Sequence, residues 1–424
     1  MLSHRAAARL LGASLLLAGC VLAAPSHAQT LTLQSALQRA LAANPRLTAA
    51  EREVGIATGQ RLQAGALVNP EVSYEQDNSF GSGPYRGTRS AETTLQISQL
   101  FELFGKREAR VAAGAAGVEA AVWQRRAARL EVLSETAIAF VTVLGTQRRI
   151  QILDEQIAAI DRLAPLLQRR VEAGASSPAE TGRAQVASDL VKADRERTRA
   201  ALASTRRDLA VLMGDTSLKA STVTGRFEAV GRPPAFQSVQ TAIDANPQLM
   251  RWTAVFAQRN AELLLARLKP YPDVRLSAGW RHFNDTGDDA VRLGVSVPIP
   301  VFDQNQGNIL SAQESLAKTN AERATTKAAL TVLAGRAYDT AQGSLRELSI
   351  LRDSAIPKAR QAAEAIEDGY GQGRFTLLEL LDAQATLAQA RLREQEALQN
   401  FHIAVATIEG LVGNPFVLAR EGAR

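Results

Sequence analysis

The strongest constraint on this chain is a plan that occurs twice, about 200 residues apart. Each copy places an alternating apolar segment directly before a long, Ala-rich helical pattern. In the second copy, Val291, Leu293 and Val295 alternate with smaller or polar residues until Pro298 and Pro300. Those prolines cannot donate to a β-sheet ladder, so they end the strand. A chain with this plan is expected to be an internal tandem duplication.

Four short sequence motifs recur in both copies at nearly the same spacing. They are Asn44-Pro45 with Asn246-Pro247, Pro70 with Pro272, Ala184-Gln185 with Ala383-Gln384, and Met213-Gly214 with Val412-Gly413. The first repeat is therefore expected over 29–224, with strands at about 70–77 and 90–99 and a helix tip near 174. The second is expected over 225–424, with strands at about 272–281 and 290–299 and a tip near 373.

The helical pattern predicts a mainly α fold with a small β part. One helical run extends from Leu103 to about Val171, and an equally long one leads to Tyr370. Ala, Leu, Gln, Arg and Glu dominate these runs, which favours long antiparallel coiled-coil helices. The net charge of +6 is spread among interleaved acids and bases. That pattern indicates solvated helix faces rather than a nucleic-acid-binding stripe.

Residues 1–28 have the pattern of a secretory signal peptide. Arg5 and Arg9 precede an apolar region, and Ser26-His27-Ala28 is a small-residue cleavage site. A second interpretation is a lipoprotein box at Leu17-Ala18-Gly19-Cys20, which would make Cys20 a lipidation site. Elsewhere no run of about 18 apolar residues predicts a transmembrane helix.

The cysteine and histidine counts exclude several kinds of chemistry. Cys20 is the only cysteine, and His282 and His402 are the only histidines after the leader. No phosphate loop, metal-spaced cluster or nucleophile motif is present. We therefore predict that the protein is not an enzyme and needs no cofactor or bound metal. The loop aspartates Asp285, Asp288 and Asp289 are more typical of a solvated loop than of a cation site.

Strands of about ten residues have the length that crosses a bilayer when tilted. Four strands cannot close a barrel, and an open sheet edge is not tolerated in lipid. Three chains would supply twelve strands, which predicts a homotrimer with one shared 12-stranded transmembrane β-barrel in outer-membrane lipid. Periodicity alone leaves open which strand face meets lipid. The alternative is two β-hairpins on a soluble helical domain.

These residues resemble the outer-membrane factor family, the TolC-type export ducts. Two motifs, SQLFELFGKR at 98–107 and PIPVFDQNQGN at 298–308, are similar to the CzcC-type branch of heavy-metal efflux. Gln304 departs from the Arg common in that branch. The resemblance implies a trimeric α-barrel in the periplasm, continuous with the β-barrel in the outer membrane of a Gram-negative bacterium. It also implies a periplasmic adaptor and an inner-membrane resistance-nodulation-division pump as partners.

The resemblance further assigns roles to the helix tips and to the strand–helix junctions. It makes the turns at Gly174 and Gly373 the adaptor-docking tips, although glycines there also simply end helices. It places a periplasmic gate at four side chains: Tyr370, Arg374, Glu180 and Phe375. The junction residues are Phe104, Gly105, Pro298, Pro300 and Phe302. Glu102 and Lys106 have the i,i+4 spacing of an ion pair.

The predicted function is a passive conduit that exports divalent heavy-metal cations of the cobalt, zinc or cadmium type. Two alternatives remain at this stage. One is an outer-membrane channel for multidrug or other small-molecule export. The other is a soluble periplasmic coiled-coil adaptor, although adaptors usually insert a Gly- and Val-rich lipoyl-like domain into one hairpin.

Overall fold

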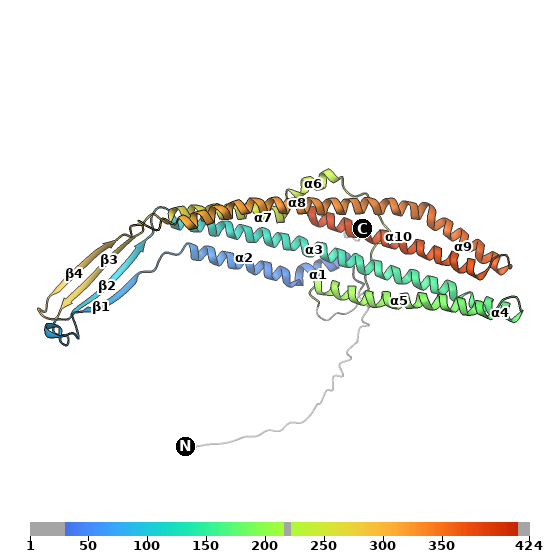
Figure 1. Cartoon of the computed structure of the whole chain (residues 1–424), viewed down its shortest axis with the longest axis horizontal. Coiled ribbons are helices and arrows are strands. Elements are labelled where there is room, and N and C mark those ends of the chain that lie inside the picture. Colours follow the sequence, from blue (N-terminus) through green and yellow to red (C-terminus); the bar gives the residue numbers. More distant parts are fainter. Residues whose placement is uncertain (1–29, 216–221, 414–424) are drawn as a thin grey trace, which may run out of the picture.

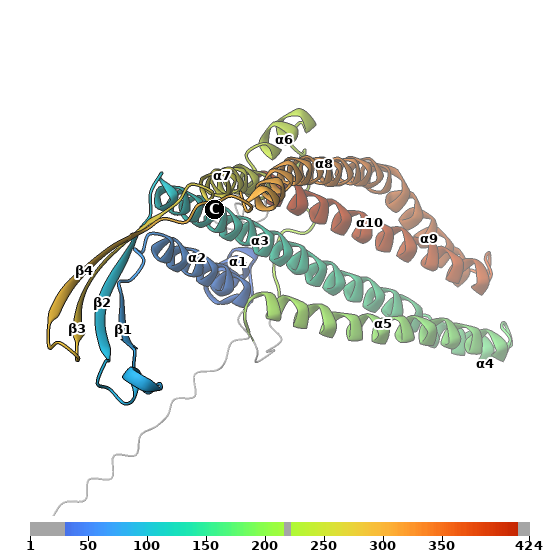
Figure 2. The same ribbon diagram turned by 60° about the vertical axis from the view of Figure 1, so that its left-hand side comes forward.

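The computed structural model describes residues 30–215 and 222–413. The molecule is strongly elongated, with its four strands at one end and the α4–α5 and α9–α10 turns at the opposite end (Figure 1). Long helices connect the two ends, and Figure 2 shows the same arrangement from a second direction. Among the described residues, no helix is both long enough and apolar enough to cross a membrane.

The first half of the chain contains five helices, a short 3₁₀ turn and two strands within the described ranges. Their bounds are α1 (Leu33–Ala43), α2 (Pro45–Ala64), β1 (Glu71–Asp77), the 3₁₀ turn (Gly83–Tyr85), β2 (Glu92–Phe101), α3 (Lys106–Asp161), α4 (Ala164–Glu172) and α5 (Pro178–Leu212). α1 begins with a capping box between Thr32 and Ser35, and Pro45 occupies the first turn of α2, where its missing N–H costs nothing.

The second half repeats this order. Its elements are α6 (Phe236–Ile243), α7 (Pro247–Leu268), β3 (Val274–Phe283), β4 (Asp289–Ser296), α8 (Gln306–Ile350), a π-helical turn (Leu351–Ala355), α9 (Ile356–Gly371) and α10 (Leu377–Val412). The strands differ from their expected bounds by at most three residues at either end, and β1 ends at Asp77 as expected. Such differences are the usual uncertainty of boundaries drawn from a pattern.

The expected unbroken helix from Leu103 to Val171 is wrong at one place. α3 ends at Asp161, and α4 starts only at Ala164. Pro165 explains the break, because its ring clashes with the carbonyl of Asp161 and it has no N–H to donate. In the second half, Pro357 follows the π-helical turn between α8 and α9 for the same reason.

The duplicated Asn-Pro motif performs the same task in both halves. The Nδ2 of Asn44 donates to the carbonyl of Leu212 over 2.8 Å, and the Nδ2 of Asn246 donates to that of Leu411 over 2.7 Å. Each asparagine also caps its own helix through Oδ1. Both side chains are buried. In the first half the motif therefore links the start of α2 to the end of α5. In the second half it links the start of α7 to the end of α10.

The core is divided into small clusters along the helices. One contains Phe140 and Val143 of α3 packed on Leu37 of α1, and another joins Ile243 of α6 to Leu330 of α8. The remaining clusters include one at the helix tips. Such a core suits a long molecule whose helices contact only their neighbours.

The four strands form one antiparallel sheet in the order β1-β2-β3-β4. Val72, Ile97, Ala278 and Leu293 share one row across the sheet. The outer edges of β1 and β4 have no strand partner within the described residues. An unpaired edge exposes backbone N–H and C=O groups, so the sheet is incomplete in a single chain.

Candidate functional site

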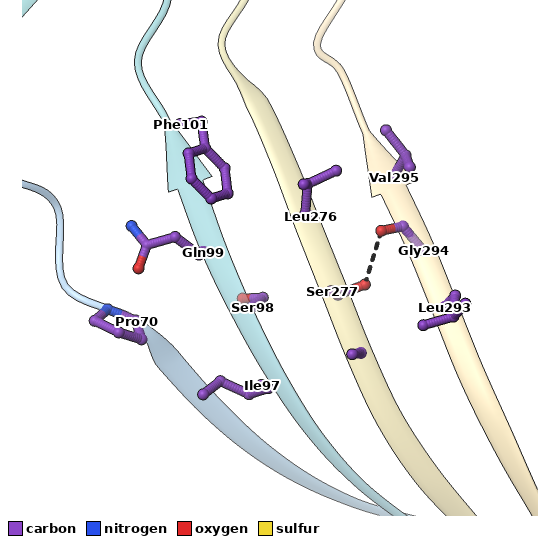
Figure 3. A pocket seen from close by; sticks show the side chains of 11 residues that line it. Pro70, Ile97, Ser98, Gln99, Phe101, Leu276, Ser277, Leu293, Gly294 and Val295 are labelled. Carbon is purple, nitrogen blue, oxygen red and sulfur yellow. Dashed lines mark hydrogen bonds between the residues drawn. The ribbon is translucent and has the colours of Figure 1, made fainter.

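One face of the sheet is apolar and open to its surroundings. Its side chains alternate along all four strands: Val72, Tyr74, Leu95, Ile97, Phe101, Leu276, Ala278, Trp280, Val291, Leu293 and Val295. Leu293 is 79% exposed and Val295 71%. Figure 3 shows the part of the sheet nearest the helices, where Ile97, Leu276 and Leu293 lie on neighbouring strands. An apolar surface of this extent requires an apolar environment.

The opposite face is polar and carries ion pairs between strands. Arg281 of β3 donates to Glu92 of β2 over 2.7 Å and to Thr94 over 2.8 Å. Arg275 of β3 reaches across β2 to Glu71 of β1 at 2.8 Å. The sheet thus has one face for lipid and one for water. This assigns the lipid-facing alternation that the sequence left open.

Aromatic residues mark both ends of the apolar face. Tyr74 and Trp280 share a row near the loops, and Phe101 ends β2 on the helical side. The rings of Phe104 and Tyr271 contact each other just beyond it, with centroids 5.1 Å apart and planes tilted by 35°. Aromatic girdles at both interfaces are typical of strands that cross an outer membrane.

The junction after β2 is held by an ion pair between a buried lysine and a half-buried aspartate. Lys106 Nζ lies 2.9 Å from Asp273 Oδ1 and also donates to the carbonyl of Tyr271. Phe104 and Gly105 have φ angles of 59° and 77°, which turn the chain into α3. The expected Glu102–Lys106 pair is wrong, because Arg110, one turn further on, pairs with Glu102 instead. Lys106 instead pairs with Asp273, which the sequence places far away.

The junction after β4 is more open. Pro298 and Pro300 lie between β4 and α8, and Phe302 is 92% exposed. Asn305 has a φ of 58°, and its Nδ2 donates to the carbonyl of Ala266 of α7 over 2.8 Å. Phe302 therefore lies exposed in the connection between the sheet and α8.

The opposite end of the molecule consists of the two helix turns. Gly174 and Gly373 have φ angles of 70° and 75°. In both turns a backbone N–H one residue past the glycine donates to a carbonyl five residues earlier: Ala175 to Arg170, and Arg374 to Gly369. These are glycine-terminated helix ends of the Schellman type, and the duplication has kept their backbone geometry.

Tyr370 joins the two turns. Its ring is buried, 1% exposed, among Leu163, Leu167 and Leu380. Its Oη donates to Glu180 Oε2 of α5 over 3.4 Å. Burial of the phenol, with a further contribution from the charge of Glu180, raises the pKa of Tyr370. The phenol therefore stays neutral and able to donate at physiological pH.

Arg170 is the tip residue that sequence reasoning missed. Its Nη1 donates to the carbonyl of Tyr370 over 2.9 Å, its Nε donates to Ser176 Oγ over 3.1 Å, and its guanidinium lies 4.8 Å from the centre of the Tyr370 ring. Arg374, the arginine expected there, is exposed. Its backbone N–H bonds to Gly369, and no side-chain partner occurs within the described residues. Only the tertiary fold brings Arg170 and Tyr370 together.

Phe375 packs back onto its own turn. A Cβ at Gly369 would lie 2.4 Å from the Phe375 ring, so only glycine fits there without displacing the ring. Phe375 is 37% exposed. Tyr370, Glu180 and Phe375 are thus gathered at one tip, with Arg170 in the place foreseen for Arg374.

The described residues hold no group of three or more His, Cys, Asp or Glu side chains that could bind a metal ion. In the second loop, Asp289 pairs with His282 at 2.8 Å instead. The proposed lipidation site, Cys20, and the leader over 1–28 lie outside the described residues.

Together, a sheet with one lipid-suited face and a long helical body that ends in two linked helix turns define a membrane-anchored duct protein. Comparison with known proteins supports this class. The model of the family described as Outer membrane efflux protein matches residues 36–215 and 238–414. The chain belongs to this family and is an outer-membrane protein.

Individual relatives include metal-resistance proteins. The chain is 30% identical over 383 residues to the cobalt-zinc-cadmium resistance protein CzcC of Cupriavidus metallidurans, covering 90% of each chain. It is 26% identical over 285 residues to the nickel-cobalt-cadmium resistance protein NccC of Alcaligenes xylosoxydans xylosoxydans, covering 67% of this chain and 64% of NccC.

Solved structures share the fold. The outer membrane protein VceC from Vibrio cholerae superposes with a TM-score of 0.76 at 20% identity, over 91% of this chain and 96% of that one. CusC superposes with a TM-score of 0.77 at 18% identity, over 90% of this chain and 92% of the CusC chain.

Proposed function

We propose that three copies of this chain form a passive outer-membrane duct for divalent heavy-metal cations of the cobalt, zinc or cadmium type. The duct would work with a periplasmic adaptor and an inner-membrane resistance-nodulation-division pump, and that pump would supply the energy. The similarity to CzcC along nine-tenths of both chains is the observation that carries the choice of cargo.

The trimer is supported by what a single chain leaves uncovered. The sheet has two unpaired edges in the part of the chain described, and three such sheets supply the twelve strands of an allowed barrel. Large apolar side chains on the helices are also exposed, among them Leu62 of α2 (74%) and Leu190 of α5 (66%). Burial of such side chains against neighbouring copies would stabilise a tube.

The helix tips are proposed as the periplasmic gate and docking end. Tyr370 links the α4–α5 turn to the α9–α10 turn through Glu180 and Arg170. Hydrogen bonds that include a charged partner contribute about 1–3 kcal/mol each. In a trimer these hydrogen bonds would occur three times and hold a ring of helix tips closed. An adaptor bound at the Gly174 and Gly373 turns could displace the hydrogen bonds. The repeats 29–224 and 225–424 would each contribute one turn to this ring.

A transport assay tests the cargo. The gene would be expressed with a cognate pump and adaptor in a host whose own metal duct is deleted. We expect restored growth at inhibitory zinc, cobalt or cadmium concentrations and lower cellular metal content. Restored resistance to organic toxicants with no change in metal content would instead support the multidrug alternative.

A conductance assay tests the gate. Tyr370→Phe combined with Glu180→Gln should raise single-channel conductance in planar bilayers without loss of the trimer. Tyr338→Phe is a suitable control, because within the described ranges its hydroxyl accepts a hydrogen bond only from Gln342, one turn away on α8. Unchanged conductance in an intact trimer would locate the gate elsewhere, with the Phe375 ring as the next candidate.

A further inference from the structure

The polar face of the sheet leaves two opposite charges unpaired. Two of its three arginines, Arg275 and Arg281, form ion pairs within the chain. The third, Arg292 of β4, has no side-chain partner among the described residues, and neither does Glu75 of β1. Both side chains are exposed. The charged side chains of this face are thus paired within the chain except on its two outer strands.

These two residues occupy complementary positions. Arg292 lies on the free-edge strand β4 and Glu75 on the free-edge strand β1, at opposite sides of the sheet. Both belong to the polar face, because Arg292 shares a row with Ser73 through Gly279 and Gln96, and Glu75 is two residues beyond Ser73. Asp77 continues the same face, and only Arg281 approaches it, at 3.8 Å. One edge is therefore basic and the other acidic.

We infer that Arg292 of one copy pairs with the acidic edge formed by Glu75 and Asp77 of the next copy, and that this pair sets the register of the seam between copies. The inference rests on the proposed trimer and specifies how its sheets join. The partner it identifies is a second copy of this chain, meeting β4 with its own β1 in antiparallel fashion.

Barrel closure is compatible with this register. Tilted strands can close only if the joining edges are staggered. In the inferred seam, the row of residues that contains Arg292 rises toward the loops as it passes from one copy to the next. At a strand tilt of about 35–45°, four strands shift this row by roughly four to six residues, so a shift of about four moves the position opposite Arg292 from Ser73 to Asp77. Long side chains also reach diagonal neighbours on the same face, so both acids lie within reach.

The pair also provides specificity. A slip by one residue would turn the apolar face of one edge strand inward and place lipid-facing and water-facing residues side by side. A slip by two residues the other way would bring Arg292 toward Glu71, which Arg275 already occupies. An arginine that faces two carboxylates on only one edge therefore favours one register over its neighbours.

Charge reversal tests the seam. Arg292→Glu should shift the trimer–monomer equilibrium toward monomer by about tenfold or more per seam at low salt, since three like charges would face the acidic edge. Glu75→Lys with Asp77→Lys should do the same. Combining all three substitutions should restore the trimer. Arg86→Glu, an exposed loop substitution outside the strands, is the matched control and should leave the trimer intact.

Cysteine cross-linking gives a second readout that does not depend on the stability of the reversed variants. Arg292→Cys combined in turn with Glu75→Cys and Asp77→Cys should yield covalent trimers with a short bismaleimide in outer membranes. Single-cysteine variants and Arg292→Cys with Tyr74→Cys, which lies on the opposite face, should not. An intact trimer that neither cross-links at these positions nor responds to charge reversal would overturn the seam but leave the proposed duct standing. A wild-type protein that never forms trimers would overturn both.

Discussion

Leu293 of β4 offers the sharpest test of the two-faced sheet. Its side chain is 79% exposed and pairs with Ala278 near the middle of the ten-residue strand β3. Ten residues span about 33 Å, or about 25 Å along the membrane normal at a tilt near 40°, which matches the apolar band of outer-membrane barrels. Leu293 thus lies near the midplane, where a charge is most costly.

Leu293→Arg should destabilise each copy by about 2–4 kcal/mol, the cost of a guanidinium at the midplane. Three copies share one barrel, so the trimer should lose roughly 6–12 kcal/mol. We expect little heat-resistant trimer in outer-membrane fractions and a lower guanidinium midpoint for trimers reconstituted in lipid.

Two controls separate charge from packing. Gln96→Arg introduces the same side chain on the polar face, one row away, and should be tolerated. Leu293→Ala removes the apolar contacts without adding charge and should cost much less. If Leu293→Arg and Gln96→Arg give equal trimer yields and equal midpoints, the assignment of the lipid face is wrong.

Three further outcomes follow from named contacts. Because burial raises its pKa, the Tyr370 phenol should ionise above the ordinary tyrosine pKa. The stability contributed by its neutral form is complete below the ordinary tyrosine pKa and is lost as pH rises through the raised value. The ultraviolet titration of Tyr370→Phe should therefore lack an ionisation step above the ordinary tyrosine pKa. Asn44→Ala and Asn246→Ala should each cost about 1–3 kcal/mol by losing a cap and orphaning a carbonyl, measured by chemical unfolding; no loss at either would refute the shared role. Gly214→Ala should be at least as costly, since its Cβ would lie 2.3 Å from the Ala43 carbonyl oxygen, and an unchanged unfolding midpoint would contradict this.

The sequence predicts the repeated architecture well because the determining signals are local. The alternation of Val291, Leu293 and Val295 defines a strand face, and Pro298 ends the strand. The echo of Asn44 in Asn246 indicates the duplication, and both asparagines make the same contacts. Periodicity could not say which face meets lipid, because that required the strand pairing that brings Arg275 and Arg281 within reach of Glu71 and Glu92.

The tip and the junction were harder to predict because their contacts join distant segments. Arg170 meets Tyr370 across 200 positions of sequence, whereas Arg374 is only its neighbour along the chain. Likewise, Lys106 pairs with Asp273 of the other repeat rather than with nearby Glu102. Spacing rules such as i,i+4 describe an isolated helix, and a buried partner from another segment overrides them.

The oligomeric state of the folded protein in the outer membrane tests the central claim most directly. Native mass spectrometry of protein extracted in mild detergent would measure the number of chains in each particle. The account predicts a particle of three chains, because a single four-stranded sheet leaves two edges unpaired. A folded, monodisperse monomer from the same membranes would contradict it.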